Sequence, residues 1–127
     1  MRRARDIMTK DVLTVSEDTP IYVAMQLLVA DHVTGLPVVD REGTLVGIVT
    51  EKDMLTLLNN DRIGHVTAGD LMTRDVVSFL ESDDLAEINK CLKEKSFRRV
   101  PILSDGKLVG IVSRSDIMKA ILRERRG

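Results

Sequence analysis

Two short stretches of the chain end in the same pairing of a hydroxyl with a carboxylate. Thr50 precedes Asp53 by three positions in TLVGIVTEKD, and Ser113 precedes Asp116 by three positions in KLVGIVSRSD. This is the spacing of a capping box, in which both side chains bond the free amides of a helix's first turn. The plain interpretation of the four residues is therefore a structural one.

The same arrangement can also bind a ligand. A strand that ends at a helix N-terminus directs free N–H groups and a positive dipole toward one point, which suits a phosphate. A carboxylate has two acceptor oxygens, and these can take the two adjacent hydroxyls of a ribose. Apolar neighbours would flank a flat base. Helix capping and ligand contact are not exclusive, because a surface carboxylate can do either.

The two stretches belong to an internal repeat. A shift of 64 positions sets Asp6 against Asp70, DIMTKDV against DLMTRDV, and Pro37 against Pro101. Two copies are too few for a solenoid, so we expect a closed pseudo-twofold pair. The sequence predicts repeats over 6–60 and 70–124, joined by a linker over 61–69.

Each repeat predicts the element order β-α-β-β-α. Short runs rich in β-branched residues indicate strands, and Pro20, at the first helical position, marks a helix start. Strands this apolar must be covered by helices, so we expect an α/β (α+β) fold. The predicted strands are 11–15, 35–40, 44–50, 75–79, 99–103 and 107–113, and the predicted helices are 20–31, 51–58, 84–95 and 114–124.

Composition narrows the class of protein. An apolar content of 43% excludes a disordered chain, and a net charge of −1 gives no general attraction to nucleic acid. We find no apolar stretch of membrane-spanning length and no signal-peptide core. His32 and His65 lack metal-like spacing to Cys or acidic residues, and no catalytic set is visible. We expect a soluble, cytoplasmic, non-enzymatic protein that binds no metal, membrane or nucleic acid.

The motifs together resemble a known family. The element order, the GhhTxxD ending (h, apolar), the hPhhD strand and the DIMTxDV opening are similar to a CBS (cystathionine-β-synthase) domain, and two in tandem resemble a CBS pair, or Bateman module. The resemblance runs from Asp6 to Leu122. It implies a stand-alone regulatory module that binds AMP, ADP, ATP or an S-adenosylmethionine-like ligand, and signals through an effector protein or self-assembly. It implies no cofactor beyond this regulatory ligand.

The resemblance also implies two ligand clefts between the repeats. The first joins Ile48, Thr50, Lys52 and Asp53 with Thr73, Val77, Phe97, Arg98, Arg99 and Val100. The second joins Ile111, Ser113, Ser115 and Asp116 with Thr9, Leu13, Val33, Thr34, Gly35 and Leu36. In this interpretation Asp53 and Asp116 hold ribose hydroxyls, while the Thr and Ser hydroxyls assist at ribose or phosphate.

The two clefts differ in charge. FRRVP at 97–101 gives the first cleft two cations, whereas VTGLP at 33–37 gives the second none. Because Arg grips phosphate with two donors, we expect the first cleft to prefer multiply charged phosphates. The alternative is that Arg98 and Arg99 lie on an exposed rim.

The helix predicted over 20–31 is apolar nearly all round, whereas its counterpart over 84–95 keeps one narrow apolar stripe. A helix covered on one side needs only one stripe, so the first helix has a face to spare. We expect a homodimer built on helices, as CBS pairs commonly form. Burial of this helix within one chain is the alternative. Two other functions also stay open, namely a ligand-free dimerisation module and a regulatory fragment of an enzyme.

Overall fold

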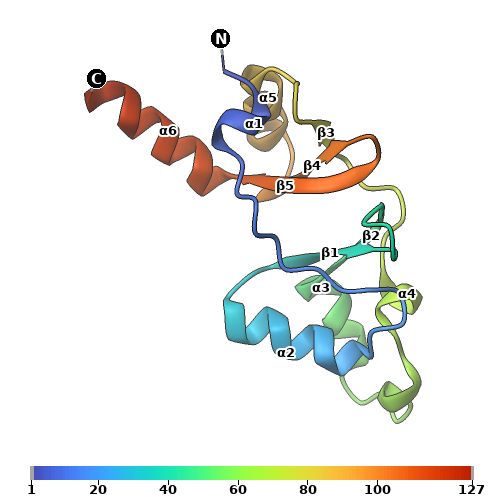
Figure 1. The fold of residues 1–127 in the computed structure, drawn as a ribbon. Helices are drawn as coiled ribbons and strands as arrows, with labels where there is room; N and C mark the ends of the chain where they lie inside the picture. Colours follow the sequence, from blue (N-terminus) through green and yellow to red (C-terminus); the bar gives the residue numbers. More distant parts are fainter. Residues whose placement is uncertain (1, 127) are drawn as a thin grey trace. The chain divides into compact units, whose positions relative to one another are not determined.

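The structure, a computed structural model, describes residues 2–126 and divides them into two compact units (Figure 1). Unit 2 is Leu13–Val76, and unit 1 combines the chain up to Val12 with the chain from Val77 onward. Each unit therefore joins the hairpin and helices of one repeat to the opening segment of the other, which is 6–12 in unit 1 and 70–76 in unit 2. The repeat and linker boundaries themselves stay a prediction from the sequence.

Unit 2 places one long helix against a two-stranded hairpin (Figure 1). The strands pair antiparallel, and Ile21, Ala24 and Leu28 of the helix bury their side chains with those of the hairpin. Gly43, at a φ of 84°, makes the turn between the strands. The elements are α2 (Ile21–Asp31), β1 (Gly35–Val39), β2 (Leu45–Thr50), α3 (Glu51–Met54), the 3-10 helices η1 (Leu55–Leu57) and η2 (Ile63–His65), and α4 (Ala68–Leu71).

Unit 1 has the same hairpin with one further short strand. The strand order is β3-β4-β5, in which β3 pairs parallel to β4 and β4 pairs antiparallel to β5. In Figure 1 the last helix continues directly from the end of β5 and extends away from the sheet. The elements are α1 (Ala4–Ile7), β3 (Phe79–Leu80), α5 (Leu85–Glu94), β4 (Arg99–Ser104), β5 (Lys107–Ser113) and α6 (Arg114–Arg126).

The predicted fold class, hairpins and long helices are confirmed, with shifts of one or two residues at their ends. Pro20 is an exception in detail, because it is the N-cap of α2 and not its first helical residue. Within residues 2–126 no helix combines the length and apolar character that crossing a bilayer requires.

Three predicted elements are wrong in extent. The strand predicted over 11–15 is reduced to a single bridge from Val15 to Val38, because the chain before Leu13 belongs to unit 1. The strand predicted over 75–79 is only Phe79–Leu80. The helix predicted over 51–58 ends at Met54 and continues as η1, where the Thr56 hydroxyl donates to the Asp53 carbonyl at 2.7 Å.

Candidate functional site

The opening segment of each repeat pairs with the second hairpin strand of the other repeat. In unit 1, Thr9 and Ile111 exchange both backbone hydrogen bonds, at 2.8 and 2.9 Å. In unit 2, Ile48 and Thr73 do the same, at 2.9 and 2.8 Å. This pairing brings a threonine beside the end of each strand, where the capping boxes lie.

A glycine in each strand permits this close approach. A Cβ on Gly110 would lie 2.6 Å from Met8 Sδ and 3.0 Å from the Thr9 carbonyl oxygen. A Cβ on Gly47 would lie 2.6 Å from Met72 Sδ and 2.9 Å from a backbone oxygen of the next residue. The repeated VGIV and DhMT motifs therefore belong together, as the strand and the segment that lies on it.

The first carboxylate is bonded on one oxygen. Asp53 Oδ2 accepts from the Thr50 N–H at 2.7 Å and from the Thr50 hydroxyl at 3.1 Å. Its Oδ1 makes no hydrogen bond to any of residues 2–126, and the side chain is half-buried. One acceptor oxygen is thus available at the end of β2.

The second carboxylate is bonded on both oxygens. Asp116 Oδ2 accepts from the Ser113 N–H at 2.9 Å and from the Ser113 hydroxyl at 3.0 Å. Its Oδ1 accepts from the Thr9 hydroxyl at 3.2 Å. Thr73 occupies the place of Thr9 in unit 2, yet no bond joins its hydroxyl to a carboxylate within residues 2–126. A ligand hydroxyl at Asp116 would compete with the Thr9 hydroxyl.

A third capping box, Thr67–Asp70, shows that this hydrogen-bonding pattern alone does not mark a ligand site. The Thr67 N–H donates to Asp70 Oδ2 at 2.9 Å, and the Asp70 N–H donates to the Thr67 hydroxyl at 3.3 Å. This pair begins α4 and follows no strand of either hairpin. The capping interpretation is therefore confirmed for Thr50–Asp53 and Ser113–Asp116, and Thr67–Asp70 is a further box of the same kind. What distinguishes Asp53 and Asp116 is their position after the second strand of a hairpin, beside an opening segment.

Arg99 is the cation with an unusual environment. It begins β4 opposite Ser113, so the two side chains share one face of the hairpin. Its Nε is buried and has no hydrogen-bond partner among residues 2–126. Arg98 is exposed, and its carbonyl accepts from the Arg114 N–H at 3.0 Å. Unit 2 has Gly35 in the place of Arg99, opposite Thr50.

Two of the predicted ligand residues lie in the hydrophobic cores. Leu36 and Val100 are each 1% exposed and pack among the core side chains of unit 2 and unit 1. A ligand could therefore meet these two residues only through their main chains, and their ligand role stays a prediction. Lys52, Phe97 and Ser115 are on the surface.

Each predicted cleft draws residues from both units, and its assembly stays a prediction. Unit 1 holds Thr9, Val77, Phe97, Arg98, Arg99, Val100, Ile111, Ser113, Ser115 and Asp116. Unit 2 holds Leu13, Val33, Thr34, Gly35, Leu36, Ile48, Thr50, Lys52, Asp53 and Thr73. Across the described part of the chain, no three His, Cys, Asp or Glu side chains gather into a potential metal site.

Sequence reasoning overlooked Gly47, Gly110, Met8 and Met72. These residues position the site threonines without carrying chemistry themselves. Their recurrence at matching places in both repeats was the available signal. Spacing alone does not say which opening segment lies on which strand.

Comparison with known proteins gives one consistent family. The model of the CBS domain matches residues 4–60 and again residues 68–123. The protein MJ1225 of Methanocaldococcus jannaschii is 31% identical over 117 residues, which is 92% of this chain and 42% of that protein. The chain therefore spans less than half of this relative.

Two solved structures share the fold over nearly their whole length. CBSX2 in complex with AMP, a protein of Arabidopsis thaliana, has a TM-score of 0.89 and 35% identity, covering 98% of this chain and 99% of that one. The CBS domain pair of MJ0100, in complex with 5′-methylthioadenosine and S-adenosyl-L-methionine, has a TM-score of 0.81 and 27% identity, covering 98% of each chain. The two family matches along one chain and these whole-length likenesses show that the chain belongs to the CBS-domain family, as a tandem CBS pair.

Proposed function

We propose that this chain is a regulatory module that binds an adenosine-containing ligand, AMP, ADP, ATP or an S-adenosylmethionine-like molecule. The observation that carries the proposal is the repeated constellation of a half-buried carboxylate, a hydroxyl and an opening-segment threonine at the end of a buried strand. The ligands of the two similar structures, AMP in CBSX2 and methylthioadenosine with S-adenosylmethionine in MJ0100, support the adenosine class.

The carboxylates would recognise the ribose. Asp53 can accept a hydroxyl on Oδ1 while Oδ2 keeps its two bonds to Thr50. A second ribose hydroxyl can share Oδ2, which has more than one lone-pair direction. At Asp116 the ribose would have to displace or share the Thr9 hydroxyl. We therefore propose two unequal clefts, with the Asp53 cleft binding more tightly.

Arg99 would recognise phosphate in the first cleft, together with Arg98 and Lys52. A buried Nε without a partner is costly, and a phosphate oxygen would satisfy it. Arg99 also lies opposite Ser113 of the second set, so its assignment to the first cleft needs its own test. A double-mutant cycle decides: Arg99→Ala should couple with Asp53→Ala, whereas coupling with Asp116→Ala would move Arg99 to the other cleft.

The output of binding would be regulatory, not catalytic. We propose that the ligand favours one arrangement of a homodimer, which then acts on an effector protein. The match covers only 42% of MJ1225, so a CBS pair can also be part of a longer protein. We propose the same regulatory role in either setting.

The test is calorimetry with AMP, ADP, ATP and S-adenosylmethionine. Loss of hydrogen bonds to a charged acceptor costs roughly 1.5–3 kcal/mol. Asp53→Ala should therefore weaken its cleft at least about tenfold. Asp70→Ala is the matched control, because it removes the same kind of capping box from α4 and should leave affinity unchanged. Binding that is undiminished in the Asp53→Ala, Asp116→Ala double variant would contradict the proposal. No binding of any of the four ligands would favour the ligand-free dimerisation module.

A further inference from the structure

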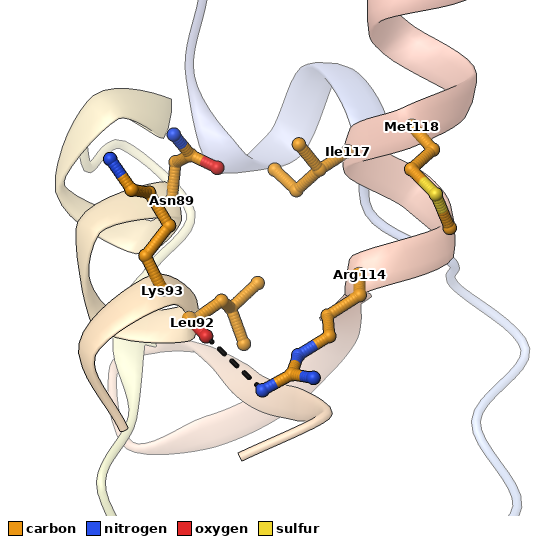
Figure 2. A pocket seen from close by; sticks show the side chains of 6 residues that line it. All are labelled: Asn89, Leu92, Lys93, Arg114, Ile117 and Met118. Carbon is orange, nitrogen blue, oxygen red and sulfur yellow. Dashed lines mark hydrogen bonds between the residues drawn. The ribbon is translucent and has the colours of Figure 1, made fainter. Parts of the chain in front are cut away.

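A depression between α5 and α6 in unit 1 combines apolar side chains with two cations. Its volume is about 340 Å³, at the small end of the range for ligand pockets. Each of the two helices contributes half of the lining side chains, as Figure 2 shows, and none of them is acidic. The lining residues are Asn89, Leu92, Lys93, Arg114, Ile117 and Met118. We call this surface the α5–α6 depression.

Both cations of the α5–α6 depression lack an acidic partner. No salt bridge within residues 2–126 includes Lys93 or Arg114. Arg114 Nη2 donates to the Leu92 carbonyl at 3.3 Å and to the Lys95 carbonyl at 3.4 Å, which holds the guanidinium at the C-terminal end of α5 (Figure 2). Its Nε and Nη1 make no hydrogen bond to any of residues 2–126. The depression thus contains an arginine that is already positioned and still has free donors.

The matching place in unit 2 has a different charge. The shift of 64 positions that aligns the repeats sets Lys93 against Val29. Directly after the capping-box hydroxyl of each hairpin, Arg114 in unit 1 matches Glu51 in unit 2. Unit 2 therefore has a valine and an anion where unit 1 has two cations. The fold that the two units share does not require these cations, so they are particular to unit 1.

A second depression continues the first along α6. It has a volume of about 270 Å³ and shares Asn89 and Ile117 with the α5–α6 depression. Its charged residues are already bonded, because Asp84 caps α5 and Arg2 pairs with Glu124 at 3.0 Å. Its remaining lining residues are Leu85, Ala86, Ala120 and Ile121. The two depressions together therefore have cations without an acidic partner at one end only.

We propose that the α5–α6 depression binds a small amphipathic anion, an organic acid with an apolar body. The charged head lies between Lys93 and Arg114, where the free guanidinium donors suit a carboxylate or phosphate. The apolar body covers Ile117 and Met118, and Met118 is 57% exposed without it. None of the lining residues belongs to the two predicted nucleotide clefts, so this site is separate from the proposed nucleotide function and does not depend on it.

Charge argues against a second copy of the chain that sits like-with-like on this surface. A twofold contact sets a patch against itself, so Lys93 and Arg114 would approach their own counterparts. The depression has no acidic side chain to compensate them. Burial of a charge without a partner is unfavourable, whereas an anionic ligand supplies the missing countercharge. A second copy is therefore the outcome that the experiment must separate from a ligand.

The test uses octanoate as the anionic probe and octylammonium as its cationic counterpart. The wild type should bind octanoate at least about tenfold more tightly than octylammonium, because only the anion can accept from the two cations. Lys93→Glu should weaken octanoate at least about tenfold and strengthen octylammonium, so its two effects have opposite signs. Lys119→Glu is the matched control, since it makes the same charge change on the surface of α6 outside the depression.

The measurement is an amide NMR titration of the full chain, which gives both the affinity and the place of binding. A ligand of about ten non-hydrogen atoms should bind with a dissociation constant on the order of a millimolar. The amides of Lys93, Arg114 and Ile117 should shift and saturate, and unshifted amides elsewhere show that each variant folds. Butyrate should bind about tenfold more weakly, because fewer methylenes reach Ile117 and Met118. No saturable shift at these amides, or equal octanoate affinity in the wild type and Lys93→Glu, overturns the proposal.

Light scattering on the same samples identifies what occupies the depression. The molar mass of the wild type should be the same with and without octanoate. If octanoate binds only as the mass falls by half, a second copy covers the α5–α6 depression, and the proposal is overturned. Asp53→Ala should leave octanoate binding unchanged, so a failure of the nucleotide function and a failure of this site give different results.

Discussion

The two units share their sheets and differ in their helices. Gly35 pairs with Thr50 in one hairpin as Arg99 pairs with Ser113 in the other, and each second strand carries an opening segment over a glycine. The outer helix faces, by contrast, are apolar in α2 and charged in α5. Close approach of two backbones restricts which residues the hairpin strands can carry. The residues of an outer helix face are restricted only by whatever covers that face. The carboxylates of the proposed ligand site thus lie where the units agree, whereas the outer helix faces are where they differ.

The closing helices extend the contrast. The segment after β2 is a four-residue α3 followed by η1, whereas α6 has thirteen residues. The Thr56 hydroxyl donates to the Asp53 carbonyl at 2.7 Å, whereas the matching position in α6 is Lys119, which has no hydroxyl and favours a helix. Similar capping boxes thus begin helices of different length.

The largest predicted effect tests whether the cores are as alike as they look. Leu28 and Leu92 occupy matching positions and are 5% and 4% exposed. Leu→Ala at either should lower the free energy of unfolding by about 2–5 kcal/mol, because it opens a cavity in a packed core. Urea denaturation measures the loss, and hydrogen exchange assigns it to unit 2 or unit 1. The exposed Leu55→Ala is the control. A much smaller loss at one site would show that its core is loosely packed.

A second prediction tests the charge difference between Arg99 and Gly35. Arg99→Ala should lower the preference for ADP over adenosine at least about tenfold, because a charge-assisted bond to phosphate contributes roughly 1.5–3 kcal/mol. Calorimetry with both ligands gives the ratio. Arg99→Lys should recover part of it, since Lys keeps the charge and loses the bidentate geometry. An unchanged ratio in Arg99→Ala would make the arginine a rim residue.

Much of this fold was predictable from the sequence, and the failures have physical causes. Short apolar runs rich in β-branched residues located the hairpins, and T/S-x-x-D located the boxes at Thr50 and Ser113. The strand predicted over 11–15 failed because its residues divide between two units, which no local pattern records. The burial of the Val100 side chain was not foreseen, although alternation along β4 turns it into the core.

A third prediction concerns the glycines beneath the opening segments. Gly110→Ala and Gly47→Ala should each lower the free energy of unfolding by about 1–3 kcal/mol. The added methyl overlaps a methionine sulfur and crowds a backbone oxygen that cannot move freely. Gly64→Ala is the control, since a Cβ there meets nothing within 4 Å. Denaturant titration compares the three variants. Equal stability of Gly110→Ala and Gly64→Ala would show that the opening segment moves to accommodate the methyl at little cost. The segment would then not hold the site threonine rigidly in place.

The smallest predicted effect tests the difference between the two carboxylates. The Thr9 hydroxyl donates to Asp116 Oδ1 at 3.2 Å, whereas Thr73 makes no such bond to Asp53 within residues 2–126. Thr9→Val keeps the shape and removes the donor, so it should cost roughly 0.5–1.5 kcal/mol of stability, and Thr73→Val should cost less. The same change should affect ligand binding in the opposite direction, because it frees an acceptor that the ribose would otherwise compete for. Calorimetry on Thr9→Val should therefore show tighter binding at the Asp116 cleft as thermal unfolding shows a lower Tm. If Thr9→Val weakens binding instead, the Thr9 hydroxyl contacts the ligand directly, and the two clefts are more alike than their hydrogen bonds indicate.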